Sequence, residues 1–485
     1  MSQYLLAIDQ GTTGTTALLI DEKLQVLAKV NHEFAQHYPH PGWVEHDPAD
    51  IWSSTCKVIA DCIAAAKLDA QKIAAIGIAN QRETTVLWER STGRPVYNAI
   101  VWQDRRTADR CEELKKQNLG KKLQQKTGLV CDPYFSATKI EWLLNNTAKD
   151  DLAFGNINTF LLWQLTAGKV HATDVGNASR TMLMDLQSCE WDDDLLDLFN
   201  VPKNILPRIV SNSEQYGVTK NVPGLPDGIP ICGMAGDQQA ALIGQACFEA
   251  GEAKCTYGTG SFILVNIGEN PLASSCGCLT TVAYQLNGKT IYAWEGSAFI
   301  AGAAVQWLRD GLGLIKASHE VESLSAQVED SGGVVFVPAL TGLGAPYWNP
   351  DAKGVIHGIN RGTTAAHIAR ATLEGIAFCQ YDILQAMRKD LGEPLKILKV
   401  DGGAAANNLL MQFQSDILQT KLSRPQLLET TALGAAFLAG LGVGVWDNLE
   451  DIKNVWQEER VFAPQLSEEA LKAKVQLWQS AVQKA

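Results

Sequence analysis

The sequence predicts an α/β protein of two lobes, each built on a mixed sheet, with a cleft between them. Strands alternate with helices along the chain, which is typical of this class. A strand–turn–strand plan with a glycine- and threonine-containing turn occurs near the N-terminus and again past the middle. The chain has 485 residues, which at about 100–200 residues per domain allows two to four compact units. We place the change of unit near residues 250–252, giving domains 1–248 and 249–485.

The composition is that of a globular protein and excludes several other classes. Hydrophobic residues make up 46% of the chain and charged residues 19%, which excludes a disordered tail, a collagen-like fibre and a coiled coil. The net charge is −12 and no long basic run occurs, so we expect no nucleic-acid partner. The apolar runs are shorter than the ~18 residues of a membrane-spanning helix, so we expect no membrane span. The eleven cysteines include no Cys-x-x-Cys pair, which predicts reduced thiols and a cytoplasmic protein.

The start of the chain predicts a meander followed by a helix and a further strand. Apolar runs over 4–8, 17–20 and 26–34 are separated by turn residues and indicate three antiparallel strands. Apolar residues then recur with helical spacing over 51–66. The run over 73–79 predicts another strand, and the polar segment that contains Arg82 and Glu83 follows it.

The middle of the chain has fewer regular signals. Five prolines between positions 202 and 230 predict connecting segments, because proline interrupts a helix. A strand is expected over 229–232. We expect it to lead into a turn over 233–239, which opens a helix of small residues.

The opening plan then returns in the second half. Strands are expected over 254–257 and 262–267, and Gly258-Thr259-Gly260 forms the turn between them. Asn287-Gly288, within 279–294, is the strongest short hairpin signal in the chain. The remaining elements expected are helices over 297–314, 364–387 and 407–419 and a strand over 395–400. The repeated plan indicates a duplicated architecture with a cleft between the two copies.

The first turn, from Asp9 to Gly14, has the composition of a phosphate-binding hairpin. Such a hairpin directs several backbone N–H groups into one concavity, and the hydroxyls of Thr12 and Thr13 add donors. Asp9, at the strand end, has the position of a carboxylate that holds a hydrated Mg²⁺ beside the phosphate. The alternative is a polar hairpin in which Asp9 only stabilises its turn. The segment is not a Walker loop, and it leads into a strand, which excludes a dinucleotide fingerprint.

Three further segments have the composition expected for other parts of a nucleotide site. The turn that contains Thr259 predicts a second hairpin, facing the first. Small residues around Gly403 and Asn407 stand where a strand meets a helix, and they let a flat ligand approach the backbone. Gly302, with Gln306 one helical turn later, offers the same approach from another wall. For each segment the alternative is that the glycine serves only tight packing.

The segment after the strand at 73–79 carries a candidate site for a small polyol. Arg82 is a forked donor and Glu83 an acceptor, and adjacent hydroxyl groups need both. Trp102 and Tyr134 are candidates to cover the carbon chain. The alternatives are a surface ion pair for the two charged residues and ordinary core packing for the aromatic ones.

Asp237 is the candidate catalytic carboxylate. It stands at the mouth of a helix among glycine, alanine and methionine. It is placed to accept a hydrogen bond from a substrate hydroxyl and to take the proton as that oxygen attacks phosphorus. The alternative is an N-cap aspartate on the helix that follows.

Taken together, these motifs resemble the FGGY carbohydrate kinases, and among them the members that act on glycerol, over nearly the whole chain. Both signatures of the family occur, at 134–143 and 354–374. The stretches that carry the resemblance begin at Asp9, Pro41, Asn80, Asn98, Asp132, Ala235, Thr256, Gly342 and Asp401.

The resemblance implies a fold, a reaction and a site. The fold would be two ribonuclease-H-like domains of the actin and hexokinase type. Domain 1–248 would hold glycerol and the phosphate loop, and 249–485 the nucleotide. The reaction would be the phosphorylation of glycerol by ATP to sn-glycerol 3-phosphate, with Asp237 as general base and Asp9 positioning Mg²⁺. The residues implied for glycerol are Arg82, Glu83, Trp102, Tyr134, Asp237, Gln238 and Phe262. Those implied for ATP are Thr12, Thr13, Gly14, Thr259, Gly302, Gln306, Gly403 and Asn407.

The chain departs from the family in three places. Thr16 stands where an arginine is common in relatives, so a cationic phosphate contact is missing there. The segments 223–230 and 463–467 do not match the sites where some relatives bind fructose bisphosphate and a transport regulator, so neither form of control is expected. Two other functions stay open: a kinase for another small polyol or ketose, and an actin-like protein that uses ATP as a switch. Homo-oligomerisation also stays open.

Overall fold

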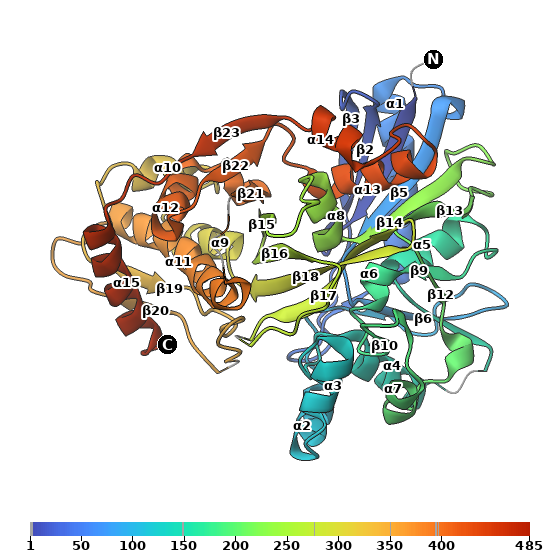
Figure 1. Ribbon diagram of the computed structural model, residues 1–485, viewed down its shortest axis with the longest axis horizontal. Helices are drawn as coiled ribbons and strands as arrows, with labels where there is room; N and C mark the ends of the chain where they lie inside the picture. Colours follow the sequence, from blue (N-terminus) through green and yellow to red (C-terminus); the bar gives the residue numbers. More distant parts are fainter. Residues whose placement is uncertain (1–2, 148–149, 276, 350, 393–394, 396) are drawn as a thin grey trace.

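Two mixed β-sheets, one from each half of the chain, form the framework of the molecule. The computed structural model describes residues 3–147, 150–275, 277–349, 351–392, 395 and 397–485. In Figure 1 the blue and green first half lies on the right, and most of the orange and red second half lies on the left. The predicted α/β class with mixed sheets is confirmed.

The first sheet has six strands in the order β13-β14-β5-β1-β2-β3. Its strands are β1 (Tyr4–Gln10), β2 (Gly14–Asp21), β3 (Val26–Glu33), β5 (Ile73–Asn80), β13 (Ser213–Val218) and β14 (Pro230–Gly236). β1, β2 and β3 pair antiparallel in chain order, which confirms the predicted meander. β5 is parallel to β1, and β14 is parallel to β5. These central strands are covered on both faces and are accordingly apolar along most of their length.

The second sheet has seven strands in the order β17-β18-β16-β15-β21-β22-β23. Its strands are β15 (Ala253–Tyr257), β16 (Ser261–Gly268), β17 (Leu279–Leu286), β18 (Lys289–Ala298), β21 (Leu398–Asp401), β22 (Leu422–Pro425) and β23 (Glu458–Phe462). The series β15, β16, β18 is antiparallel, and β21 lies parallel to β15 on the other side. This repeats the pattern of β1, β2, β3 and β5, so the duplicated plan inferred from the sequence is confirmed. Asn287 and Gly288 both have positive φ (51° and 77°), as a two-residue hairpin requires.

Four element boundaries differ clearly from the sequence-based expectation. β14 continues to Gly236, so the turn expected over 233–239 is wrong, and helix α8 (Asp237–Gly244) starts directly at the strand end. β18 runs to Ala298 because it pairs with β16 as far as Ser261. Helix α9 (Gly302–Asp310) therefore begins later than expected. β21 likewise begins only at Leu398.

Helix α13 (Thr430–Gly442) joins the two halves. Although it comes late in the chain, it packs on β1, β5, β14 and α8 of the first half. The contact is close: a Cβ on Gly77 would lie 2.0 Å from the carbonyl oxygen of Ala435, and one on Gly434 1.8 Å from that of Ala240. The helix is apolar on all sides because it is buried on all sides. The domain division near residue 248 stays a prediction.

Further helices cover the sheets. The first sheet is covered by α1 (Pro48–Ala66), which packs on β2 and β3 and begins at the cap residue Asp47. In the second half, α11 (Ala365–Leu391) packs against α9, α12 (Asn408–Leu418), α10 (Glu320–Ser325) and β18. The other elements of that half are β19 (Val335–Val337), β20 (Val355–His357), η3 (Gly403–Ala406), α14 (Leu449–Val455) and α15 (Glu468–Val482).

A smaller region is inserted into the first half, around a four-stranded sheet of order β4-β7-β6-β8. Its strands are β4 (Glu45–His46), β6 (Thr85–Glu89), β7 (Ala99–Ile100) and β8 (Leu152–Asn156). The helices are α2 (Ala108–Lys116), α3 (Gly120–Thr127), α4 (Ser136–Asn145), α5 (Ile157–Leu165), α6 (Val175–Ala178) and α7 (Asp193–Leu198). Short pieces complete the half: η1 (Ala70–Lys72), β9 (Ala172–Asp174), β10 (Met184–Asp185), β11 (Glu190–Trp191), η2 (Lys203–Ile205) and β12 (Arg208–Val210). Among the described residues, none of the helices combines the length and apolarity of a membrane span.

Candidate active site

Two glutamine side chains hold the hairpin between β1 and β2 in place through its carbonyl groups. The N–H of Gly11 donates to the carbonyl oxygen of Gly14 (2.9 Å), which closes the turn. Gln36 Nε2 donates to the carbonyl oxygen of Thr12 (3.0 Å), and Gln81 Nε2 donates to that of Gly11 (3.1 Å). With its carbonyl groups tied down in this way, the hairpin has a fixed shape. Thr13, at the tip, is exposed.

His46 connects the two glutamines. It is fully buried, with Nε2 2.7 Å from Gln36 Oε1 and Nδ1 3.3 Å from Gln81 Nε2. A neutral ring with the proton on Nε2 satisfies both contacts, donating to Gln36 and accepting from Gln81. Burial, and to a lesser degree the charge of His37, lowers the pKa of His46 to about 4.

We expect acidification to weaken the fold through His46. In the unfolded chain this histidine takes up a proton near pH 6.5, but in the fold only near pH 4, so the unfolded state binds more protons between these values. The free energy of unfolding should therefore fall by up to about 3 kcal/mol as the pH drops across this interval. Urea unfolding of the wild type and of His46→Gln at pH 7 and at pH 4.5 measures this difference. If both proteins lost the same stability on acidification, the prediction would fail.

Asp9 lies at the end of β1, half-buried beside the hairpin. Burial raises its pKa to about 7, and the nearby carboxylate of Asp237 adds to the shift. No group of three or more histidine, cysteine, aspartate or glutamate side chains within the described ranges could enclose a metal ion. Mg²⁺, however, commonly takes one or two protein carboxylates and completes its shell with water and substrate phosphate. Two carboxylates that repel each other at the edge of the hairpin fit such a cation.

The second hairpin is docked on the start of α9. The N–H of Gly258 donates to the carbonyl oxygen of Gly260 (2.9 Å), and the N–H of Gly302 donates to that of Gly258 (2.9 Å). A Cβ on Gly302 would lie 2.7 Å from the Gly258 oxygen, so the packing alternative holds for this glycine. Thr259, at the tip, and Gln306, on α9, are both exposed.

The segment after β21 behaves differently from the hairpin. Gly402 has φ 86°, and a Cβ there would lie 2.5 Å from the carbonyl oxygen of Tyr257, so this glycine serves packing. Gly403 is exposed, with open space where a Cβ would stand, so packing does not explain it. Asn407 caps α12, and its Oδ1 accepts from the N–H of Leu410 (2.9 Å). The capping contact uses one side of the Asn407 amide.

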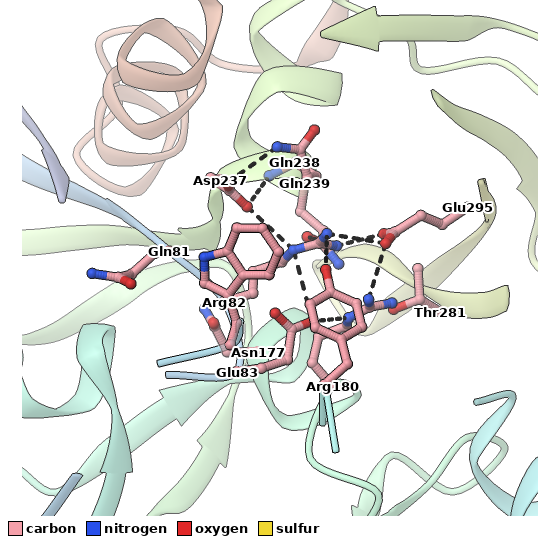
Figure 2. A network of polar contacts seen from close by, with 12 residues as sticks. Gln81, Arg82, Glu83, Asn177, Arg180, Asp237, Gln238, Gln239, Thr281 and Glu295 are labelled. Atoms are coloured by element: carbon pink, nitrogen blue, oxygen red, sulfur yellow. Dashed lines mark hydrogen bonds and ion pairs between the residues drawn. The ribbon is translucent and has the colours of Figure 1, made fainter. Parts of the chain in front are cut away.

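Arg82 is the centre of the polar network in Figure 2. It is 3% exposed, so the surface ion pair that was the alternative for it is excluded. Its Nε lies 3.2 Å from Asp237 Oδ1, and its Nη2 donates to the hydroxyl of Tyr134 (3.3 Å). Nη1 donates to Gln239 Oε1 (3.3 Å), and Nη2 also donates to Glu295 Oε1 (3.0 Å). The buried fork therefore connects the candidate base with the aromatic wall.

Glu83 is also buried, and its backbone has the unusual φ of 58°. Arg180 Nε donates to its Oε1 (2.6 Å), whereas the nitrogen of Arg82 is 4.0 Å away. Burial raises the pKa of Glu83, and the two guanidinium groups oppose that shift.

Asp237 is the first residue of α8 and carries one of the more accessible carboxylates of the network. Its side chain is 32% exposed, and the N-cap of the helix is Gly236, so the N-cap alternative is wrong. Oδ1 accepts from the N–H of Gln238 (2.8 Å), and Oδ2 accepts from Gln238 Nε2 (3.1 Å). Gln238, the next residue of the same helix, thus fixes the orientation of the Asp237 carboxylate.

Aromatic rings from both halves gather beside this network. The ring centroid of Trp102 lies 5.7 Å from that of Tyr134 and 6.4 Å from that of Phe262, which stands on β16 of the second half. Trp102 Nε1 also donates to Thr12 Oγ1 (2.9 Å). The Trp102 side chain therefore connects the phosphate-type hairpin with the candidate polyol pocket.

The structure brings one part of the predicted site together by direct contact. The residues in that part are Thr12, Arg82, Trp102, Tyr134, Asp237, Gln238 and Phe262, with Glu83 and Asp9 alongside. Gly302 and Thr259 form the second hairpin with its helix. Within the described residues, no hydrogen bond, ion pair or ring contact joins Gln306, Gly403 or Asn407 to the first group, so a link to it would need a bound ligand.

Sequence reasoning missed four buried polar side chains of the network. They are Arg180, Gln239, Lys254 and Glu295. Lys254 Nζ donates to Thr256 Oγ1 (2.9 Å) and to Gln238 Oε1, and burial lowers its pKa. The available signal was a charged residue inside an apolar strand, as Glu295 is in β18 and Lys254 in β15. Such residues are almost never fully buried unless they are paired.

Comparison with known proteins places this geometry in a family context. A model described as the FGGY family of carbohydrate kinases, N-terminal domain, matches residues 4–244, and the model of the C-terminal domain of that family matches 253–443. Glycerol kinases of Myxococcus xanthus and Bdellovibrio bacteriovorus are each 54% identical to the chain, over 100% of it and 99% of their own length. Glycerol kinase 2 of Thermotoga maritima is 52% identical with the same coverage.

Solved structures show the same architecture. The crystal structure of Plasmodium falciparum glycerol kinase with ADP has a TM-score of 0.92 and 41% identity, covering 100% of this chain and 98% of that one. A gluconate kinase from Lactobacillus acidophilus has a TM-score of 0.88 at 23% identity, covering 100% of this chain and 97% of that one. The second likeness shows the fold alone.

Proposed function

The chain belongs to the FGGY family of carbohydrate kinases, and from this premise we propose that it transfers the terminal phosphoryl group of ATP to glycerol. The observation that supports this proposal most strongly is the sequence identity of 52–54% to glycerol kinases over the whole chain. A xylulose kinase from Lactobacillus acidophilus shares the fold at a much lower identity of 23%. The product is sn-glycerol 3-phosphate.

Glycerol would bind between the polar network and the aromatic rings. Arg82 and Tyr134 offer donors and Glu83 an acceptor to adjacent hydroxyl groups. Trp102 and Phe262 flank the space that the three carbons would fill. A pocket that pairs each hydroxyl rejects analogues that leave a buried group unpaired.

Asp237 would act as the general base. Its carboxylate is held by Gln238 and Arg82 on one side, and its exposed part faces the accessible side of the network. Phosphoryl transfer depends mainly on in-line positioning and on neutralising charge, with little covalent work for the protein. A base that is fixed in direction and in contact with the hydroxyl-binding arginine meets the positioning requirement.

The phosphates of ATP would lie between the two hairpins. Thr12, Thr13 and Gly14 supply donors from one side, and Thr259 from the other. Mg²⁺ held at Asp9 would neutralise phosphate charge when bound. Gly302, Gln306, Gly403 and Asn407 would contact the rest of the nucleotide, and the open space at Gly403 suits a flat base.

The same proposal divides the chain into two domains, residues 1–248 and 249–485. Asp237 and the first hairpin come from one part, and Phe262 and the second hairpin come from the other, so closure of the lobes would exclude water, the competing acceptor. We also propose a cytoplasmic enzyme without a nucleic-acid partner. The acidic net charge of −12 supports this, and so do free thiols on both halves of the chain, among them Cys62, Cys232 and Cys255.

A coupled assay of ADP release with a panel of acceptors tests the proposal. We expect kcat/KM for glycerol to exceed that for xylulose, ribulose and erythritol by at least about 10³-fold, because unpaired buried groups penalise the wrong acceptor. Faster turnover with one of the other three compounds would show that this compound, and not glycerol, is the substrate. Binding of ATP with no transfer to any acceptor would favour an actin-like switch protein.

A further inference from the structure

We propose that Arg180 and Glu295 are positioning residues of the acceptor site, which hold Arg82 and Glu83 in the geometry that receives glycerol. Glu295 does so from the half of the chain that carries the second hairpin. The inference rests on the proposed function and deepens it. Among the described residues, neither Arg180 nor Glu295 forms a hydrogen bond or ion pair with the hairpins or with Asp237.

Glu295 grips the fork of Arg82 with both oxygens. Its Oε1 accepts from Arg82 Nη2 (3.0 Å), and its Oε2 accepts from Arg82 Nη1 (2.5 Å). Both side chains are almost fully buried, at 0% and 2% exposed. A paired fork of this kind fixes the plane of the guanidinium group as well as its position. Because Glu295 stands on β18, the contact crosses from one half of the chain to the other (Figure 2).

Arg180 completes the network from the segment after α6. Its Nη2 donates to Glu295 Oε1 (2.9 Å), and its Nε donates to Glu83 Oε1 (2.6 Å). The centre of its guanidinium group also lies 5.6 Å from the ring centroid of Tyr134 and 5.2 Å from that of Phe135. Arg180 therefore contacts two of the residues that would line the glycerol pocket, Glu83 and Tyr134, and helps to hold them in place.

The four charges balance one another inside the protein. Two guanidinium groups face two carboxylates, and none of the four side chains is more than 2% exposed. Burial alone would raise the pKa of Glu295, but Arg180 and Arg82 hold it at about 2, so this carboxylate stays ionised at neutral pH. Removing one charge leaves its partner buried without compensation, which is costly.

The network also limits which carboxylates Arg82 can pair with. With Glu295 occupying both terminal nitrogens, Arg82 presents its Nε edge to Asp237 at 3.2 Å. Without Glu295, the carboxylates left to Arg82 are Asp237 and Glu83. These are the groups that a substrate hydroxyl must meet, so Arg82 would compete with glycerol for them. The alternative is an ion pair that only stabilises the fold, and the two cases predict different kinetics.

Glu295→Gln separates the two cases, because it keeps the shape and removes the charge. We expect the KM for glycerol to rise roughly 30-fold and kcat to fall, as for the loss of one partner of a buried charge pair, while the KM for ATP changes less than about twofold. Glu374→Gln is the matched control: Glu374 is buried (8% exposed) and also paired with an arginine and a lysine, but on α11. We expect its KM for glycerol to equal that of the wild type. A folded Glu295→Gln with wild-type KM for glycerol would overturn the inference.

A double-mutant cycle tests whether Glu295 acts through Arg82. In the background of Arg82→Lys, which has no fork to grip, adding Glu295→Gln should change kcat/KM less than about threefold. Losses that multiply instead would overturn the proposal. If Glu295→Gln does not fold, Arg180→Lys takes its place, and we expect the same rise in the KM for glycerol alone. The wild type is assayed in parallel, and its failure to phosphorylate glycerol would overturn the proposed function itself, with this inference.

Discussion

Asp237→Asn is expected to lower kcat for glycerol phosphorylation about 10³-fold while ATP still binds. The asparagine keeps the oxygen that accepts from the N–H of Gln238, so the start of α8 should persist. It removes the carboxylate that we propose takes the proton as the glycerol oxygen attacks phosphorus. The proposed nucleotide contacts come from the two hairpins, which this change does not alter. Single-turnover ADP release measures the chemical step, and calorimetry measures ATP binding.

Asp47→Asn is the matched control for that experiment. Asp47 caps α1 by accepting from the N–H of Ala49 (2.8 Å), and asparagine caps a helix about as well as aspartate. We expect its kcat to equal that of the wild type. A kcat within tenfold of wild type for Asp237→Asn would remove Asp237 from the role of base and leave it as a hydroxyl ligand.

The features that could be predicted from sequence are local ones. The hairpin at Gly11–Gly14 and the one at Gly258–Gly260 are each written in a few consecutive residues, between apolar runs of strand length. The same holds for the turn at Asn287-Gly288, whose positive φ values few other residues adopt easily. Contact between neighbours in the chain is enough to specify such turns.

The turn predicted from small residues before α8 was wrong because packing, and not a turn, requires the glycines there. Gly233 and Gly236 were expected to form a turn, yet both lie in β14. A Cβ on Gly233 would lie 2.6 Å from the amide nitrogen of Ala439 on α13, and one on Gly236 2.6 Å from Cγ of Arg82. The first glycine admits a helix from the far end of the chain, and the second admits the arginine of the site. No local pattern distinguishes this use of glycine from a turn.

The charged part of the site could be predicted only in part, because its partners are distant in sequence. Arg82 and Glu83 were found as neighbours, but they are not each other's main partners. Glu295 is 213 residues away from Arg82, and Arg180 is 97 from Glu83. The tertiary fold alone brings them together. A charged residue in an apolar strand showed that a partner must exist, without showing which one.

Arg82→Met is expected to damage both stability and activity. It removes one of the two arginines that pair with the buried Glu295, and it removes the cation beside Asp237. We expect the free energy of unfolding to fall by about 3–5 kcal/mol, as when one member of a buried ion pair is removed. Urea unfolding measures this. Arg309→Met is the control, since its pair with Asp310 is exposed on both sides (37% and 64%) and its loss should cost about 1 kcal/mol or less.

Activity and stability then separate in a double variant. Combining Arg82→Met with Glu295→Met removes opposite charges together, so the uncompensated carboxylate disappears and most of the lost stability should return. Activity should not return, because Arg82, the side chain proposed to contact the glycerol hydroxyls, is still missing, and kcat/KM should stay about 10³-fold below wild type. Recovery of stability together with glycerol phosphorylation would show that Arg82 is needed only for folding. Recovery of stability alone would assign the Arg82–Glu295 pair to the acceptor site, since the protein would then be folded but lack these two side chains.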